Sequence, residues 1–202
     1  MKDLIILTAD KNTKFLLQGL LPRLPQVLGI KRIEYDIEVH PERDPGCRIS
    51  SHEFLRPFVH DYHYSIVIFD YEGCGRQNEM PCTIENEIKN KLNDNGWDLR
   101  NNVFIINPEI ENWVWIKSPH LSSAINFGSI DELYKWLSEN NLISENQTKP
   151  LRPKEVFEKA LRKSKTPRSS SIYEKIAKQA SFKNCTDNEF NKFINQMYEW
   201  FK

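Results

Sequence analysis

The sequence predicts an α/β fold in which a mostly parallel sheet is flanked by helices. Short apolar segments typical of strands alternate with amphipathic segments typical of helices, an order that favours a parallel sheet covered on both faces. The strongest apolar run, Tyr64–Phe69, leads directly into Asp70, Tyr71 and Glu72 and then a turn with two glycines. Ligands bind just outside the carboxyl ends of strands in such sheets, so these carboxylates mark a candidate site.

Four segments are predicted to form the strands of this sheet. Asp3–Thr8, Tyr64–Phe69 and Val103–Asn107 are short and mostly apolar, as strands buried on both faces are. In Ile33–Val39, apolar residues alternate with acidic ones, which indicates a strand with one solvated face near the edge of the sheet.

Three helices are predicted among and after these strands. Their apolar spacing assigns them to Asn12–Leu21, Thr83–Asn95 and Ser129–Asn140. Gly96 ends the second of them, since glycine readily adopts the left-handed conformation after a helix. Pro108 suits the first turn of a further helix after the last strand.

The segment after the second strand is predicted to be a loop. His40–Gly46 contains Pro41, Pro45 and Gly46, which punctuate regular structure. Ser50 with Glu53 has the spacing of a capping box, which predicts a short helix beginning there.

The chain has no strand signal from residue 150 onward. Helices are predicted over Pro153–Lys163, Ser170–Gln179 and Asp187–Phe201. We therefore expect an α/β domain over residues 1–145 and a helical C-terminal appendage over residues 150–202. The appendage forms either a subdomain or an extra layer on the sheet.

Charge is distributed unevenly along a chain whose formal net charge is zero. Residues 1–148 carry 15 basic and 22 acidic side chains, whereas residues 149–202 carry 13 basic and 6 acidic ones. This pattern indicates an anionic partner, nucleic acid above all, or a solvated helical face that docks on the acidic body. The candidate nucleic-acid-binding residues are Lys149, Arg152, Lys154, Arg162, Lys163, Lys165 and Arg168.

Composition favours a cytoplasmic protein with no membrane partner. No apolar run approaches the roughly 20 residues that span a bilayer, and the apolar start of the chain is too short for a signal peptide. The four cysteines form no Cys-x-x-Cys motif, which favours reduced, mostly structural thiols. A zinc site of Cys47, His52, Cys74 and Cys82 is disfavoured because it lacks closely spaced pairs.

Acidic residues follow three of the predicted strands. Asp10 follows the first, Asp70 and Glu72 the third, and Glu109 and Glu111 the fourth. If these strands are parallel neighbours, the carboxylates converge on one edge, where Mg²⁺ with a substrate phosphate can offset their repulsion. Taken alone, Asp10 is better explained as a helix cap, and Glu109 as an acid in a first helical turn.

The loop after the second strand opens on the same edge. Arg43 is a candidate for contacting a phosphate, and His40 for proton transfer. The alternative for both is a loop held together by its own contacts.

Three segments in order resemble a known family: Leu4–Leu17 with Asp10, Phe69–Gly73, and Pro108–Trp113. Over roughly residues 1–140 the chain is similar to small Toprim-like proteins, relatives of the topoisomerase–primase domain and of overcoming-lysogenization-defect nucleases, often found in bacterial defence loci. The resemblance implies a Rossmann-like sheet.

The resemblance also implies roles for individual residues. It implies that Asp10 replaces a catalytic glutamate, that Asp70 and Glu72 bind Mg²⁺ or Mn²⁺, and that Glu111 is the glutamate of the last motif. Asp10 is one methylene shorter than the family's residue, and Glu72 one longer, which weakens the case for turnover more than for metal binding.

Three functions follow from these residues. The first is a Mg²⁺-dependent nuclease or nuclease-like component of an anti-phage defence system, with Asp10 and Arg43 as catalytic residues and Asp70, Glu72 and Glu111 as metal ligands. The second is a catalytically weak interaction subunit that binds protein partners in a defence complex. The third is a metal-dependent phosphohydrolase that acts on a small substrate.

Overall fold

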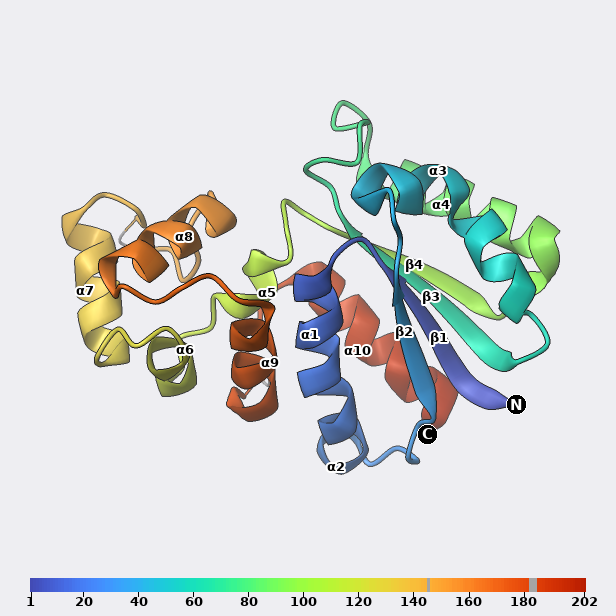
Figure 1. Cartoon of the computed structure of the whole chain (residues 1–202), viewed down its shortest axis with the longest axis horizontal. Coiled ribbons are helices and arrows are strands. Elements are labelled where there is room, and N and C mark those ends of the chain that lie inside the picture. Colours follow the sequence, from blue (N-terminus) through green and yellow to red (C-terminus); the bar gives the residue numbers. More distant parts are fainter. Residues whose placement is uncertain (145, 182–184) are drawn as a thin grey trace.

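Four parallel strands form the central sheet, in the order β2–β1–β3–β4 (Figure 1). They are β1 (Lys2–Thr8), β2 (Tyr35–Val39), β3 (Tyr62–Asp70) and β4 (Asn101–Ile106). The computed structural model describes residues 1–144, 146–181 and 185–202. The predicted α/β fold with a parallel sheet flanked by helices is confirmed, and β2 lies at an edge of the sheet as its alternating pattern predicted.

The register of the sheet brings the carboxyl ends of the strands to one edge. Thr8 of β1 pairs with Val39 of β2 and Ile68 of β3, and Asp70 pairs with Ile106 of β4. The residues that follow these positions therefore lie side by side, at the edge that we call the carboxyl edge. This is where ligands bind in open α/β sheets.

One face of the sheet is covered by α3 (Arg43–Leu55) and α4 (Pro81–Leu92), which lie together in Figure 1. Ile5 and Leu7 of β1 are buried in this layer. Their neighbours Leu4 and Ile6 are buried in the opposite layer. Because successive side chains of a strand point to opposite faces, a strand buried on both faces is apolar throughout.

The opposite face is covered by α1 (Lys11–Leu20) and α10 (Asn188–Phe201). The ring of Trp200 in α10 stacks on Tyr64 of β3, with ring centroids 4.3 Å apart. Helix α9 (Ser170–Gln179) packs along α1 at Gly19, where a Cβ atom would lie 2.5 Å from the Glu174 carbonyl oxygen. Helices α9 and α10 thus share the hydrophobic core of this face.

Helix α5 (Glu111–Val114) follows β4 at the carboxyl edge. Beyond it, α6 (Pro119–Ala124), α7 (Ile130–Glu139) and α8 (Pro153–Lys163) lie in the lobe on the left of Figure 1. The predicted helix over Ser129–Asn140 is present as α7, and it begins with a capping box in which the Ser129 hydroxyl accepts from the Glu132 amide. The predicted boundary between the two parts of the chain falls at residues 145–150, and Glu145 lies outside the described residues.

Some predicted elements have different bounds. Strand β2 begins two residues later than predicted, and α5 begins at Glu111 rather than beside Pro108. Helix α2 (Leu24–Leu28) was not predicted. Short 3₁₀ turns follow α1 at Leu21–Arg23 and α3 at Arg56–Phe58. A π-helical turn follows α4 at Asn93–Trp97, and Gly96 within it has a φ of 92°.

The prediction of a loop over His40–Gly46 is wrong, because α3 begins at Arg43. Pro45 falls in its first turn, where a backbone N–H has no partner within the helix and its absence costs little. Gly46 allows the His40 ring to approach: a Cβ atom there would lie 2.1 Å from Nδ1. Ser50 therefore lies inside α3 rather than capping a helix, and its hydroxyl bonds the Gly46 carbonyl.

Within the described residues, no helix combines the length and the apolar composition that crossing a membrane requires.

Candidate metal centre

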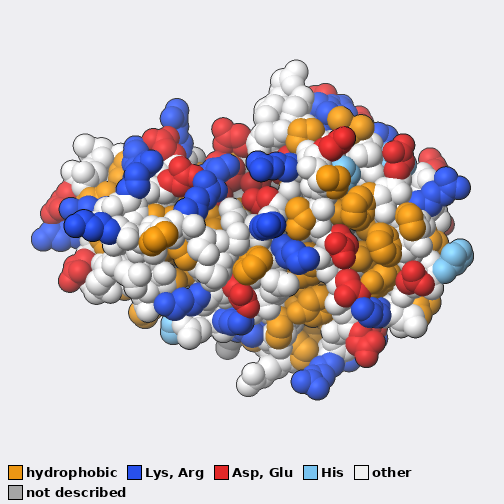
Figure 2. All heavy atoms as spheres, viewed as in Figure 1, with side chains coloured by type: hydrophobic (Ala, Val, Ile, Leu, Met, Phe, Trp, Pro, Cys, Tyr) orange, Lys and Arg blue, Asp and Glu red, His pale blue; other side chains and the backbone are white. Residues whose placement is uncertain are grey.

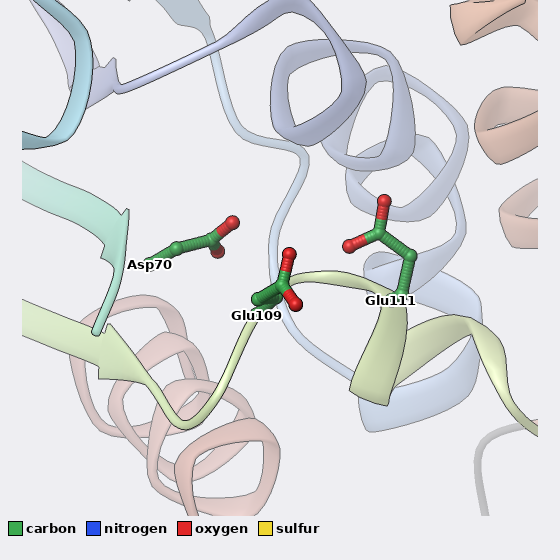
Figure 3. A group of neighbouring side chains, drawn as sticks. All are labelled: Asp70, Glu109 and Glu111. Carbon is green, nitrogen blue, oxygen red and sulfur yellow. The ribbon is translucent and has the colours of Figure 1, made fainter. Parts of the chain in front are cut away.

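Three carboxylates meet at the carboxyl edge of the sheet. Asp70 ends β3, Glu109 lies in the loop after β4, and Glu111 begins α5, and their side chains point toward one another (Figure 3). Each offers one oxygen, and these oxygens all lie within 4.8 Å of one another, so this acidic cluster can bind a metal ion. A set of carboxylate oxygens suits hard divalent cations.

Backbone hydrogen bonds fix the cluster in place. The Ile110 amide, between the two glutamates, donates to Asp70 Oδ1 over 2.8 Å. The Glu72 amide donates to the Pro108 carbonyl over 3.0 Å. The loops after β3 and β4 are therefore joined, which holds Asp70 against Glu109 and Glu111.

Glu111 is the most deeply buried member, with 1% of its surface exposed. Its Oε1 accepts a hydrogen bond of 2.5 Å from the hydroxyl of Tyr173 in α9. Its Oε2 is buried without a hydrogen-bond partner among the described residues. Leaving a buried carboxylate oxygen unpaired is costly, and a bound cation removes that cost.

Burial and mutual repulsion disfavour ionisation of these carboxyl groups. Burial raises the pKa of Asp70 well above its ordinary value, and the charges of Asp44, Glu111 and Asp10 raise it further. Burial is also the largest cause of the raised pKa values of Glu109 and Glu111. Groups crowded in this way release their protons more readily when a cation binds.

One ammonium group already reaches the cluster. Lys154 of α8 places Nζ 2.8 Å from Glu109 Oε2. Burial lowers the pKa of Lys154, but its hydrogen bond to Glu109 and the surrounding carboxylates outweigh this, so the pKa is raised on balance. One ammonium can balance the charge of at most one of the three carboxyl groups when they are ionised.

Asp44 is a fourth acid at this edge, and sequence reasoning missed it. It lies in the first turn of α3, and its Oδ1 accepts a hydrogen bond of 2.9 Å from the Asp70 amide. Burial raises its pKa. Asp44 follows the second strand just as the other acids follow theirs, so the same rule would have found it had the start of α3 been recognised.

Two other acids singled out from the sequence lie beside the cluster. Asp10 caps α1, with Oδ1 accepting from the Thr13 amide over 2.8 Å, and its charge still raises the pKa of Asp70. Glu72 is exposed and lies within hydrogen-bonding reach of Glu109. The structure brings Asp70 together with Glu109 and Glu111, while Glu72 stays at the rim.

Two open hollows flank the cluster. The α8 hollow, of about 630 Å³, is lined by Asp44, Glu72, Gly73, Glu109, Arg152, Lys154, Glu155 and Glu158. The α1–α3 hollow, of about 560 Å³, is lined by Ala9, Asp10, Lys11, Asn12, Val39, His40, Pro41, Arg43 and Arg168. Figure 2 shows acidic side chains gathered in the notch above the sheet, with basic side chains on both sides.

His40 has a structural role in this arrangement. It is 5% exposed, its Nδ1 accepts from the Glu42 amide over 3.1 Å, and its Nε2 lies 3.2 Å from the Ser50 hydroxyl. These contacts correspond to a neutral ring with the proton on Nε2, and burial lowers the pKa of His40 accordingly. His40 therefore ties the loop after β2 to α3.

The candidate nucleic-acid-binding residues have different surroundings. Lys154 and Arg152 line the α8 hollow, and Arg168 lines the α1–α3 hollow. Lys149 donates to the Asn112 carbonyl over 2.7 Å. The remaining three, Arg162, Lys163 and Lys165, are exposed.

No protein-family profile, curated protein sequence or solved structure matches this chain. The resemblance to Toprim-like proteins therefore stays a prediction, and functional conclusions rest on the geometry of the carboxyl edge.

Proposed function

We propose that the chain is a divalent-metal-dependent nuclease whose metal is held by Asp70, Glu109 and Glu111. The observation that carries this proposal is the Oε2 atom of Glu111, which is buried, unpartnered among the described residues and beside two further carboxylates. An all-oxygen donor set favours Mg²⁺ or Mn²⁺. Such an ion, when bound, activates water and stabilises the charge that develops on a phosphoryl group.

The surroundings of the cluster favour a polymeric substrate. The hollows on both sides open onto the surface and contain arginine side chains, which suit phosphate oxygens. A small phosphorylated substrate calls for a more enclosed pocket, because ligand sites bury most of a small molecule's surface. An extended nucleic-acid strand can instead reach the cluster across the open surface.

The other residues of this edge have roles in the proposal. Asp10 caps α1 through Oδ1, which leaves Oδ2 to accept a proton in the hollow that it shares with Arg43. Tyr173 orients Glu111 by donating to Oε1, and the Ile110 amide orients Asp70. Lys154 balances part of the charge of Glu109.

The test has a binding arm and a cleavage arm. Titration calorimetry measures Mn²⁺ binding by the wild type, by Asp70→Asn and by Glu111→Gln, with Glu139→Gln on the far helix α7 as the control. The same proteins are incubated with single-stranded and double-stranded DNA and with RNA, in Mg²⁺, Mn²⁺ or EDTA. We expect binding and cleavage in the wild type and the control, and their loss in the other two variants.

Two results would contradict the proposal. Absence of Mn²⁺ binding by the wild type rejects the metal centre. Cleavage that persists in Asp70→Asn with Mn²⁺ present rejects this site as the place of reaction.

The ion pair between Lys154 and Glu109 favours a second candidate function. An internal ammonium substitutes for part of the charge of a metal ion, as expected of an interaction subunit without turnover in a multi-protein defence complex. This candidate predicts that the wild type cleaves none of the substrates. It also predicts that Lys154→Met, which leaves Glu109 without its cation, strengthens Mn²⁺ binding without producing cleavage.

A further inference from the structure

The two hollows that flank the acidic cluster carry opposite charge. In the α1–α3 hollow, Lys11, Arg43 and Arg168 face a single carboxylate, Asp10, while the buried His40 is neutral. In the α8 hollow, five carboxylates outnumber Arg152 and Lys154. A polyanion is attracted to the first hollow and repelled by the second.

We propose that the α1–α3 hollow is a phosphate-binding subsite that holds the nucleic-acid backbone on one side of the bond to be cut. The inference rests on the proposed function and adds to it the side on which the substrate strand is bound. The strand is anchored on the α1 side of the cluster, and the part of the strand on the far side of the metal is not held by the α8 hollow.

Two of the three cations are available to a ligand. No described residue forms an ion pair or a side-chain hydrogen bond with Lys11 or Arg43, and both side chains are exposed. The backbone of Arg43 has a φ of 54°, a conformation that non-glycine residues rarely adopt and that is enriched at functional sites. Arginine also binds phosphate oxygens in a bidentate manner, which gives it geometric specificity.

The third cation reaches the hollow from the far end of the sequence. Arg168 lies in the connection between α8 and α9 and forms an ion pair with Glu158. Two residues later, the Ser170 hydroxyl donates to Asn12 Oδ1 over 2.8 Å and ties this connection to the first turn of α1. These two contacts hold Arg168 beside residues near the start of the chain.

The test compares two double variants that remove the same charge. Arg43→Gln/Arg168→Gln changes the α1–α3 hollow, and Arg32→Gln/Arg56→Gln changes two exposed arginines outside it. Both are built on Asp70→Asn, so that the probe stays intact. The probe is a fluorescein-labelled single strand of about 12 nucleotides, as DNA and as RNA, and its anisotropy is measured in EDTA.

We expect the Arg43/Arg168 variant to bind about tenfold more weakly and the control to change less than about twofold. The slope of log K against log salt should fall by about 1.4, since each phosphate contact on a single strand contributes about 0.7. Arg43→Gln alone, which removes no described ion pair, should weaken binding about threefold with an unchanged melting temperature.

Equal affinities of the two double variants would overturn the subsite, whether both are weakened or neither is. Cleavage by the wild type is measured in parallel. Selective loss of binding in the Arg43/Arg168 variant, with no metal-dependent cleavage by the wild type, would keep the subsite as a polyanion site and reject the nuclease function. Metal-dependent cleavage by the wild type, without selective loss of binding in the Arg43/Arg168 variant, would keep the nuclease function and reject the subsite.

Discussion

Acidic residues at the two ends of the sheet have different surroundings and opposite shifts in pKa. At the amino ends of the strands, Asp3 bonds Lys31 and Asp36 bonds Lys2, each over 2.6 Å, and both carboxyl groups have lowered pKa values. At the carboxyl edge, Glu109 pairs with Lys154, no described residue forms an ion pair with Asp70 or Glu111, and all three carboxyl groups have raised pKa values.

The difference distinguishes acids that form ion pairs at the amino ends from acids that form the candidate metal centre. For Asp36 the largest cause of the lowered pKa is its hydrogen bond with Lys2, whereas for Asp70 the largest cause of the raised pKa is burial among other acids. Residue type and distance from a strand end are similar in the two places. What marks a candidate site is a group of buried acids without enough cations, because such groups destabilise the folded protein unless a ligand compensates.

The largest expected effect comes from matched Asp→Asn changes at the two ends. With Mn²⁺ at about 100 times its Kd, the wild type and Asp36→Asn should gain about 2.7 kcal/mol in free energy of unfolding. Asp70→Asn should gain close to none, although without metal it should be more stable than the wild type because a buried acid is removed. Urea unfolding with and without Mn²⁺ measures both quantities. An equal gain in free energy of unfolding with Mn²⁺ in the two variants would contradict the distinction between the two ends.

The second effect concerns the partner of Glu111. Tyr173→Phe leaves both oxygens of that buried carboxylate without a protein hydrogen bond from the described residues, so metal affinity should fall about 10- to 100-fold, as for other residues that orient metal ligands. Tyr134→Phe removes a similar hydroxyl, bonded to the Thr148 carbonyl, and should leave the affinity unchanged. Calorimetric titration of both variants with Mn²⁺ measures these affinities, and an equal affinity in the two would contradict the role of Tyr173.

The third effect is the response of stability to pH without metal. At the carboxyl edge the folded pKa values lie above the unfolded ones, so the folded state binds more protons and stability falls as pH rises from about 4. A difference of one between the folded and unfolded pKa of a group changes the free energy of unfolding by about 1.4 kcal/mol. Asp3 and Asp36 act in the opposite sense: their contribution is present above their unfolded pKa and is lost as pH falls through the folded value.

Urea unfolding in EDTA from about pH 4 to pH 8 tests this response. Asp70→Asn should flatten the decline toward high pH, and so should Mn²⁺ added to the wild type. A wild type whose stability rises steadily over the whole range would contradict the raised pKa values.

The smallest effect belongs to the amino end. Lys2→Met removes a cation whose side chain is half-exposed, so the free energy of unfolding should fall by about 0.2–1 kcal/mol. High salt should shrink the difference from the wild type, since it screens exposed ion pairs. The measurement is urea unfolding at low and at high ionic strength, and a loss as large as that of a buried pair would show that the amino end is less exposed to solvent than described.

Much of the fold could be predicted because its signals are local. The strands are apolar runs bounded by polar residues, and Pro153–Lys163 and Ser170–Gln179 match α8 and α9 because caps and prolines mark their ends. The start of α3 was missed because the fit of Gly46 against the His40 ring depends on a contact that sequence pattern does not reveal.

The candidate site could be predicted in part, because the acids that follow the strands are also a local signal. Acids that follow parallel strands share an edge, and this rule pointed to Asp10, Asp70, Glu72, Glu109 and Glu111. The preference for Glu111 over Glu109 as a metal ligand came from the resemblance to Toprim-like proteins. Which neighbours turn inward depends on the loop after β4, where the Ile110 amide bonds Asp70 and brings Glu109 into the cluster while Glu72 stays exposed. Tyr173 has no sequence signal, because it reaches Glu111 from a helix 62 positions further on.

The bond between Tyr173 and Glu111 has a consequence for the order in which the protein is made. Chains emerge from the ribosome N-terminus first at about 5–20 residues per second, so all three acids of the cluster are synthesised seconds before Tyr173. A nascent chain at that stage has the carboxylates but neither the hydroxyl that orients Glu111 nor Lys154 beside Glu109. The acidic edge is completed late in synthesis, when the helices that follow fold back over it.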